Sequence, residues 1–390
     1  MINAILTVMS LLLLSTQLSS ADTLSYQYKS FLKLEHDNNK LMRNSDTEAT
    51  EGASLSNSIE LFKTNARAES YLRAVMLISE YTGEDEKIHS DEDYTIFYGT
   101  NYSWPRLSVA VQGDHRREST YINEIEDSGI VENSKFRITN KFATAATYVT
   151  SPRSTVTVDA SITDLAFPDT VPVSLSEYTY INKSMTGAYR LSKKSQVVLS
   201  LFETNYDAHS SATKTDTTGF NATISYTFDP LWSGMFTYGQ RYTDFSPACA
   251  SDECDDQGEV INFNIEREGQ KTDTNLKYSK TLTPNSSGNL NETQQMVASY
   301  RLSLTPRLSA ELKYKDYENE ALSKLSASRD KSYQAGFINI YYALDRQWYL
   351  TSRFTHKKQK YSDALDSGSA DSNSLYFILG YNGHKTGFSL

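Results

Sequence analysis

The sequence has few of the features that mark helical membrane proteins or soluble globular proteins. Beyond the N-terminal region, no stretch is long and apolar enough for a transmembrane helix, which needs about 20 apolar residues. Hydrophobic residues make up 38% of the 390-residue chain, a low share for a globular protein. A barrel with a wet interior needs fewer apolar residues, because only its outer face must avoid water.

Motifs of known enzyme classes are also missing. The six histidines are scattered, and there is no Gly-x-Ser-x-Gly elbow, no His-Glu-x-x-His motif and no Gly-rich phosphate loop. Asp114 and His115 lie together at the outer end of an expected strand, where surface-barrel proteases use such residues. Adjacent strand residues face opposite sides of a sheet, so this pair does not share a site. We expect no enzyme activity, no catalytic residue and no cofactor.

The charge balance excludes another class of partner. The net charge is −10, and nucleic-acid binding needs a basic surface. Acidic residues cluster in expected loops near residues 83–86, 90–93, 124–127 and 252–256. Acidic loops are commonly just solvated; a surface that binds a partner is the alternative.

Cysteine is nearly absent, and the two cysteines lie close together. Cys249 and Cys254 flank the sequence Ala-Ser-Asp-Glu. In an exported chain this spacing predicts a local disulfide that pins a loop. A metal site is the alternative, but two ligands without a nearby histidine do not make a zinc site.

The N-terminus has the pattern of a targeting segment. An apolar run from near Ile5 is too short to span a bilayer, and Ser19, Ser20 and Ala21 supply small residues for cleavage. We expect a signal peptide over residues 1–21 and a single domain over residues 22–390. The first three residues lack the usual Lys or Arg.

A pattern with a period of two covers the rest of the chain, most clearly in Gln294–Tyr317. Apolar and aromatic residues alternate with polar ones on both sides of a short Thr-Pro-Arg break, which predicts an antiparallel hairpin. About 18 such strands can be drawn, with 16 as the alternative. Short turns alternate with longer loops, as in outer-membrane barrels. We therefore predict an all-β fold, a transmembrane antiparallel up-and-down β-barrel.

Closure of the sheet follows from backbone chemistry, because every N–H and C=O must be paired in lipid. The chain contains 27 tyrosines, and several near strand ends fit interfacial aromatic girdles. Those tyrosines are Tyr26, Tyr94, Tyr102, Tyr148, Tyr178, Tyr226 and Tyr242. A soluble all-β protein is the alternative, but nothing in the pattern would cover its apolar face.

The polar face of the expected strands carries many basic residues and fewer acidic ones. The acidic residues clearest on this face are Glu35, Asp159 and Glu311. The residues we expect to line a lumen are Lys135, Arg137, Lys141, Arg301, Lys313, Lys315, Arg353 and Lys357. Rings of basic side chains favour anions in a pore. Alternatively, the lumen charges only keep the interior wet and pair across strands.

Three features stand out: the exported start, the sequence Leu34-Glu35-His36-Asp37-Asn38-Asn39 at the end of the first strand, and the Pro-Arg-Leu-Ser turns at Pro105–Ser108 and Pro306–Ser309. In these features the chain resembles outer-membrane β-barrel porins, some of which accompany exopolysaccharide systems. The resemblance covers the expected mature chain and implies a porin-like or export barrel, but it transfers no functional residue. One departure is that Phe388 stands third from the end, where many such barrels end on an aromatic residue.

The resemblance and the pattern together predict location and function. We expect a protein of the bacterial outer membrane that contacts outer-membrane lipid. It would pass small hydrophilic solutes, anionic or saccharide, by passive diffusion, or export a polysaccharide. The alternative is a non-conducting structural or adhesive barrel that binds a partner through acidic extracellular loops. Porins often form trimers, but the sequence does not fix an oligomeric state.

Overall fold

The computed structural model describes residues 23–40, 42, 47, 49–82, 91–119, 136–168, 176–209, 213–246, 256–284, 290–322, 330–362 and 367–389. Within these residues the chain forms nineteen strands in one sheet. Every strand pair in the sheet is antiparallel, and each of the first eighteen strands pairs with its neighbours in sequence. The predicted all-β, up-and-down architecture is confirmed.

The long strands have 13 to 16 residues each. Their bounds are β1 Thr23–Asp37, β2 Thr50–Thr64, β3 Ala68–Thr82, β4 Asp91–Ser103, β5 Leu107–Ser119, β6 Phe136–Ser151, β7 Ser154–Ala166, β8 Tyr178–Arg190, β9 Ser195–Ala208, β10 Thr213–Thr227, β11 Trp232–Ser246, β12 Asp256–Glu268, β13 Thr272–Pro284, β14 Leu290–Ser303, β15 Leu308–Ala321, β16 Asp330–Ala343, β17 Trp348–Ser362 and β18 Ser367–Asn382.

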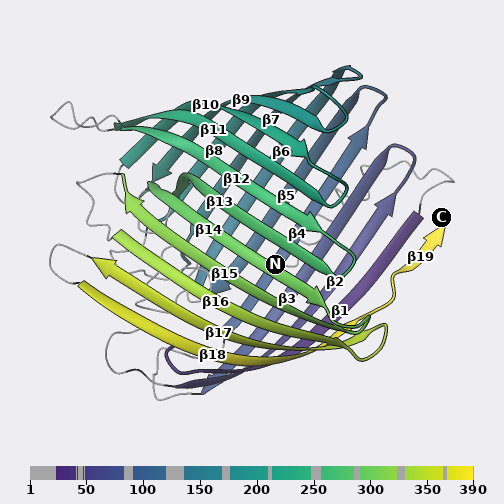
Figure 1. Ribbon diagram of the computed structural model, residues 1–390, viewed down its shortest axis with the longest axis vertical. Coiled ribbons are helices and arrows are strands. Elements are labelled where there is room, and N and C mark those ends of the chain that lie inside the picture. The colour runs from purple at the N-terminus through teal and green to yellow at the C-terminus, as the bar shows by residue number, and fades with distance from the viewer. Residues whose placement is uncertain are drawn as a thin grey trace.

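The first and last long strands close the barrel (Figure 1). β18 pairs with β1 from Lys29↔Asn382 to Asp37↔Ser374. The four-residue strand β19, Thr386–Ser389, continues this seam and pairs with β1 up to Tyr26↔Thr386. The C-terminal side has one more residue than β1 between these pairs, which is a β-bulge. Eighteen long strands therefore enclose one lumen, as the sequence predicted.

Short turns lie at one end of the barrel, which we call the short-turn end, together with the C-terminus (Figure 1). Several begin with Asn or Asp, whose side chain caps the turn. The Asn65 Oδ1 atom accepts hydrogen bonds from the backbone N–H groups of Arg67 and Ala68 at 2.9 and 2.7 Å. Asp229 and Asp345 cap two later short turns in the same way, because each carboxylate accepts hydrogen bonds from two backbone N–H groups of its turn. This local chemistry explains why turn positions could be read from the sequence.

The two faces of the wall differ as the period of two requires. Large apolar side chains on alternate residues point outward and are exposed, such as Leu199 and Leu201 on β9. The residues between them point inward and are largely polar. Buried hydroxyls pair across strands there, as Thr217 and Thr243 do at 3.1 Å. The outer face therefore suits lipid and the inner face suits water.

Aromatic residues concentrate on the outer face at the short-turn end. Trp104 packs against Tyr102 with ring centroids 4.3 Å apart, and Trp348 packs against Tyr381 at 5.0 Å. Trp232, the third tryptophan of the chain, starts β11 at the same end. These residues form an aromatic girdle at the short-turn end, one of the two interfacial girdles expected for such a barrel.

The placement of Tyr178 in an outer girdle is wrong. Its side chain is only 7% exposed and packs on the inner face against Tyr206, with ring centroids 5.3 Å apart. The register places Tyr178 opposite Ala208, which is fully buried. Position near a strand end does not determine which face a side chain occupies; the parity of the strand does.

Candidate permeation site

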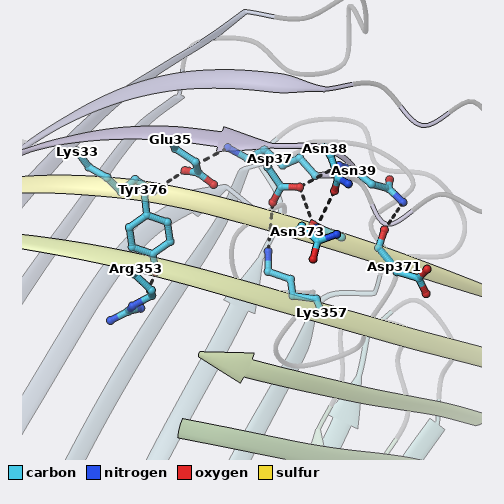
Figure 2. Close-up of polar contacts among 12 residues, drawn as sticks. Lys33, Glu35, Asp37, Asn38, Asn39, Arg353, Lys357, Asp371, Asn373 and Tyr376 are labelled. Atoms are coloured by element: carbon cyan, nitrogen blue, oxygen red, sulfur yellow. Dashed lines mark hydrogen bonds and ion pairs between the residues drawn. The ribbon is translucent and has the colours of Figure 1, made fainter. Parts of the chain in front are cut away.

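The chain turns into the barrel where β1 ends, at Asp37. The buried Asp37 Oδ1 atom accepts hydrogen bonds from the Asn39 backbone N–H at 3.0 Å and from the Ser372 hydroxyl at 2.6 Å. The Asn39 side-chain amide donates to the Asp371 carbonyl at 2.8 Å. These bonds fix the segment after β1 to the inner side of β18 (Figure 2).

Two further contacts carry this segment along the wall. Asn38 and Asn373 exchange hydrogen bonds, from Asn38 N to Asn373 O at 3.1 Å and from Asn373 N to Asn38 Oδ1 at 2.7 Å. Met42 then packs in a buried cluster with Tyr333 and Ala335 of β16 and Ala370 of β18. The segment therefore crosses the inner face from β1 to β16 and narrows the lumen.

Charged side chains of both signs gather beneath this segment. We call the group the β1 cluster, and its members are Lys33, Glu35, Asp37, Lys40, Arg353 and Lys357. The Glu35 carboxylate lies 2.6 Å from the Lys33 ammonium and 3.7 Å from that of Lys40. The Asp37 carboxylate lies 3.6 Å from the Lys357 ammonium. Three lysines thus pair with two carboxylates, and Arg353 lies beside them as a fourth cation; Figure 2 shows most of this group.

Lys40 is the most enclosed cation of the cluster. Its side chain is 5% exposed, and its ammonium lies 3.1 Å from the ring centroid of Tyr81. Burial lowers the pKa of Lys40 to about 7, although the nearby Glu35 carboxylate opposes this shift. The net charge of the β1 cluster therefore changes near neutral pH.

Arg353 has a different environment. Its guanidinium donates to the Tyr376 hydroxyl at 2.6 Å and to the Asn339 side chain, and it lies 5.2 Å from the Tyr376 ring centroid. It forms no ion pair with any residue that the structure describes. Neutral partners orient the planar group and leave its charge uncompensated, which suits contact with a passing anion.

A second charged group lies across the lumen, on β11 to β14. We call it the Arg241 cluster, and its members are Arg241, Asp256, Lys280 and Glu292. The Arg241 side chain is 2% exposed, bonds to Asp256 and lies 2.8 Å from the Glu292 carboxylate, which also pairs with Lys280 at 2.8 Å. Two cations here meet two carboxylates, so the charges are balanced.

A glycine makes room for Arg241. Gly258 lies opposite Arg241 in the ladder of β11 and β12. A Cβ atom at this position would lie 2.3 Å from the Arg241 guanidinium carbon. The arginine therefore lies flat across β12 and reaches Glu292 on β14.

The ends of β13 and β14 bend into the barrel next to this cluster. Pairing of β12 with β13 stops at Ile261↔Lys280, although both strands continue. Leu290, at the start of β14, packs with Leu165 of β7 and Tyr206 of β9 in one buried cluster. Four strands lie between β9 and β14, and the five spacings between neighbouring strands amount to about 24 Å along the wall at about 4.8 Å each. The contact thus crosses the interior and restricts the lumen from the other side.

Two cavities open along the inner wall. One of about 400 Å³ is lined by residues of β1 to β5 that include Lys29, Arg73, Asp93 and Glu118. The other, of about 520 Å³, lies at the short-turn end beside Lys193. Both are lined by charged and hydroxyl groups, so the interior offers water-filled space on either side of the narrowed zone.

The structure places the described members of the predicted lumen set on the inner face. Arg353 and Lys357 come together in the β1 cluster. Lys313 and Lys315 lie nearby on β15, opposite Phe337 and Ala335.

The remaining members of the set lie apart from that cluster. Arg137 pairs with Glu118 at 3.8 Å, and Arg301 pairs with Asp273 at 3.6 Å near the short-turn end. Lys141 lies opposite the inward-facing Asp114. Lys135 and the predicted disulfide of Cys249 and Cys254 lie outside the described residues.

The inner face carries more carboxylates than the three identified from the sequence. Besides the predicted Glu35, Asp159 and Glu311, the inner face carries several acidic residues that the sequence reading missed, which pair with lysines or arginines. They include Asp37, Glu60, Asp114, Glu118, Asp256 and Asp273. The reason is strand extent, because several of these residues lie near strand ends where parity was not assigned. Many lumen charges are therefore paired.

The separation of Asp114 from His115 is confirmed. Asp114 faces inward and accepts a hydrogen bond from Arg116 at 2.9 Å. His115 faces outward, and its Nδ1 atom lies 2.6 Å from the Asn140 side-chain oxygen. The described residues contain no cluster of His, Cys, Asp or Glu suited to a metal ion. No helix among them is long and apolar enough to cross a membrane.

Comparison with solved structures matches the barrel to outer-membrane porins at the level of the fold. A BenF-like porin from Pseudomonas fluorescens Pf-5 aligns with a TM-score of 0.51 and 10% identity, over 93% of this chain and 99% of that one. OccAB4 of Acinetobacter baumannii gives 0.48 and 10%, over 93% and 98%. OpdK of Pseudomonas aeruginosa gives 0.47 and 10%, over 93% and 99%. No protein-family model and no curated protein sequence matches this chain. The predicted resemblance to outer-membrane β-barrel porins is thus confirmed as a likeness of fold.

Proposed function

We propose that this protein is a porin-like channel of the bacterial outer membrane that lets small hydrophilic solutes diffuse down their gradients. The observation that carries the proposal is a closed barrel of eighteen long strands with an apolar outer face and a polar, charged lumen. A barrel of this size encloses an aqueous space rather than a packed core. The likeness of fold to a solved porin supports the same function.

Selection of solutes would occur at the narrowed zone. The β1 cluster holds more cations than carboxylates, and Arg353 is oriented by neutral partners. An anionic solute would exchange hydration water for these side chains as it passes. Lys313, Lys315 and Lys357 would extend the basic path along β15 and β17, and Arg137, Lys141 and Arg301 would line other parts of the lumen.

The protein would act as a channel and not as an enzyme. Its outer face would contact outer-membrane lipid, with the short turns in the periplasm and the long loops outside the cell. A leader over residues 1–21 would direct export, and a disulfide between Cys249 and Cys254 would pin an extracellular loop. Assembly into trimers stays a prediction from the porin resemblance.

A second candidate is a non-conducting surface barrel that binds a partner through its acidic loops. The observation that favours it is the inward bend of the β13–β14 end, because the Leu290 contact crosses the lumen. Such a barrier would also oppose passage of a polysaccharide chain. Small solutes, by contrast, could pass through the part of the lumen that the β13–β14 end leaves open.

A planar-bilayer recording of the purified, refolded protein tests the proposal. Discrete current steps are expected when single barrels insert. Protein that runs as a folded barrel and inserts, yet carries no current, would refute the channel and support the surface-binding candidate.

A further inference from the structure

The short-turn end carries an array of exposed cations, two of which, Lys193 and Lys194, also border the cavity at this end of the lumen. Nine Lys and Arg residues lie in the turns themselves, between the strands, and all nine are exposed. They are Arg67, Arg106, Arg153, Lys193, Lys194, Lys271, Arg307, Arg346 and Lys385. We propose that this basic rim binds the phosphate groups of anionic phospholipids in the adjoining leaflet. The inference rests on the proposed placement of the barrel in the outer membrane.

The rim cations are available to such a ligand. Among the described residues none of the nine forms an ion pair. Lys194 donates to the Phe228 carbonyl at 3.0 Å, and Lys385 lies 4.2 Å from the Phe62 ring centroid, so both are held at the rim. Besides the two backbone hydrogen bonds of its turn, the nearby Arg307 lowers the pKa of the Asp345 carboxyl, but among the described residues none of the nine is held in a salt bridge.

The acidic residues of the same turns serve another purpose. The turns contain only Asp229 and Asp345. The Asp345 carboxylate accepts hydrogen bonds from the backbone N–H groups of Gln347 and Trp348 at 2.7 and 2.8 Å, and these bonds lower the pKa of Asp345. Asp229 caps its turn in the same way. Nine cations thus face two carboxylates, in a chain whose overall charge is −10.

The aromatic belt identifies lipid as the partner. All three tryptophans lie on the outer face at this end, directly beside the basic turns: Trp104 precedes Pro105-Arg106, and Trp348 follows Arg346. The Arg267 guanidinium also lies 5.9 Å from the Trp232 ring centroid. Tryptophan and tyrosine belts lie at the level of lipid headgroups, so the neighbouring cations lie where phosphates are. Basic segments next to a membrane surface bind anionic lipid.

The charge distribution has a direction. Acidic residues concentrate in the sequence of the long loops, near residues 84–86, 124–127 and 252–255. Cations concentrate at the opposite rim. This polarity would hold the short-turn end against a phospholipid leaflet and give the barrel a preference for one orientation.

Lipid retention measured by native mass spectrometry tests the proposal. The full-length refolded protein is mixed with equal amounts of phosphatidylglycerol and phosphatidylcholine in detergent, and retained lipids are counted. The test variant is Arg106→Gln/Arg153→Gln/Arg307→Gln, which neutralises the three Pro-Arg turns. The matched control is Lys214→Gln/Lys358→Gln/Lys360→Gln, which removes the same charge from the outer face at the other end.

We expect the wild type and the control to retain more phosphatidylglycerol than phosphatidylcholine. In the test variant the ratio of retained phosphatidylglycerol to phosphatidylcholine should fall by at least about fivefold, because each cation near an anionic surface contributes about that factor to lipid binding. Equal retention of both lipids by the wild type, or equal losses in both triple variants, would overturn the inference. A change in conductance of the test variant without a change in lipid preference would also overturn it and assign the rim to the pore mouth. Barrels that keep the preference but never conduct would refute the channel and leave this inference standing.

Discussion

The β1 cluster and the Arg241 cluster lie on different sides of one lumen and differ in charge balance. In the Arg241 cluster, two cations and two carboxylates are matched, and the central arginine is nearly inaccessible. In the β1 cluster, three lysines share two carboxylates, and the fourth cation, Arg353, bonds only to the Asn339 amide and the Tyr376 hydroxyl. A matched, buried group holds chain segments together, whereas an unmatched group retains charge for a ligand.

The difference shows how one barrel can hold structural and functional charge on the same inner face. The Arg241 cluster ties the bent end of β14 to β11 through Glu292. The β1 cluster lies under a segment that is already fixed by hydrogen bonds of Asp37 and Asn39. Its surplus charge is therefore not needed for folding.

The largest effect is expected where the charges are matched. Arg241→Met should lower the free energy of unfolding by about 3–5 kcal/mol, because it leaves Asp256 without its cation and the nearly buried Glu292 carboxylate with Lys280 alone. The measurement is a guanidinium titration of the refolded barrel followed by tryptophan fluorescence. Arg301→Gln is the control, since its pair with Asp273 is largely exposed and should be worth about 1 kcal/mol or less. Equal losses in the two variants would remove the distinction between the clusters.

The next effect concerns selectivity. Arg353→Gln should reduce the preference for anions over cations by about two- to fivefold, since a unit charge about 4 Å away is worth about 1 kcal/mol in water. The preference is measured from reversal potentials of single channels. Lys358→Gln, on the outer face of the same strand, should leave it unchanged. If both variants behave alike, Arg353 does not face the permeation path.

The smallest effect is a dependence on pH. Because the pKa of Lys40 lies at about 7, this side chain loses its proton as the pH rises from 6 to 8. The anion preference of the wild type should therefore fall over this range, by less than the Arg353→Gln effect, since Glu35 partly compensates the charge. His36, His115 and His356 lie on outward-facing positions and should not contribute.

Lys40→Met is the control for the pH dependence, and its selectivity should not change between pH 6 and 8. The same pKa shift also predicts the sign of a stability change. Folding lowers the pKa of Lys40 from 10.5, so the folded barrel carries the cost of a buried charge below pH 7. Stability of the wild type should rise between about pH 7 and pH 10.5. A selectivity step that persists in Lys40→Met would contradict this assignment.

The strand architecture could be predicted from sequence because its signals are local. Alternation like that in Gln294–Tyr317, together with the short turns, predicted about eighteen strands with 16 as the alternative, and the structure has eighteen long strands. Strand ends are harder to predict: β18 begins at Ser367, where polar residues without alternation still pair with β17. The C-terminal bulge was missed, since no alternation marks the extra residue.

The narrowing of the lumen could not be predicted, because it depends on contacts between distant segments. Asp37 bonds to Ser372, and Arg241 reaches Glu292. In the sequence, Asp37-Asn38-Asn39 has the composition of an ordinary polar loop. Lys40 was overlooked for the same reason, as its burial arises from Tyr81 and from the wall beneath it. Parity could identify inward cations such as Arg353, but not which of them have a carboxylate partner.

If the surplus cations at the narrowed zone select the solutes that pass, single wild-type channels should prefer anions. The decisive measurement is the reversal potential of such channels across a salt gradient at pH 6, where the β1 cluster carries its full positive charge. We expect an anion-selective potential. A cation-selective potential at this pH would show that these cations do not set the selectivity, even if the barrel conducts.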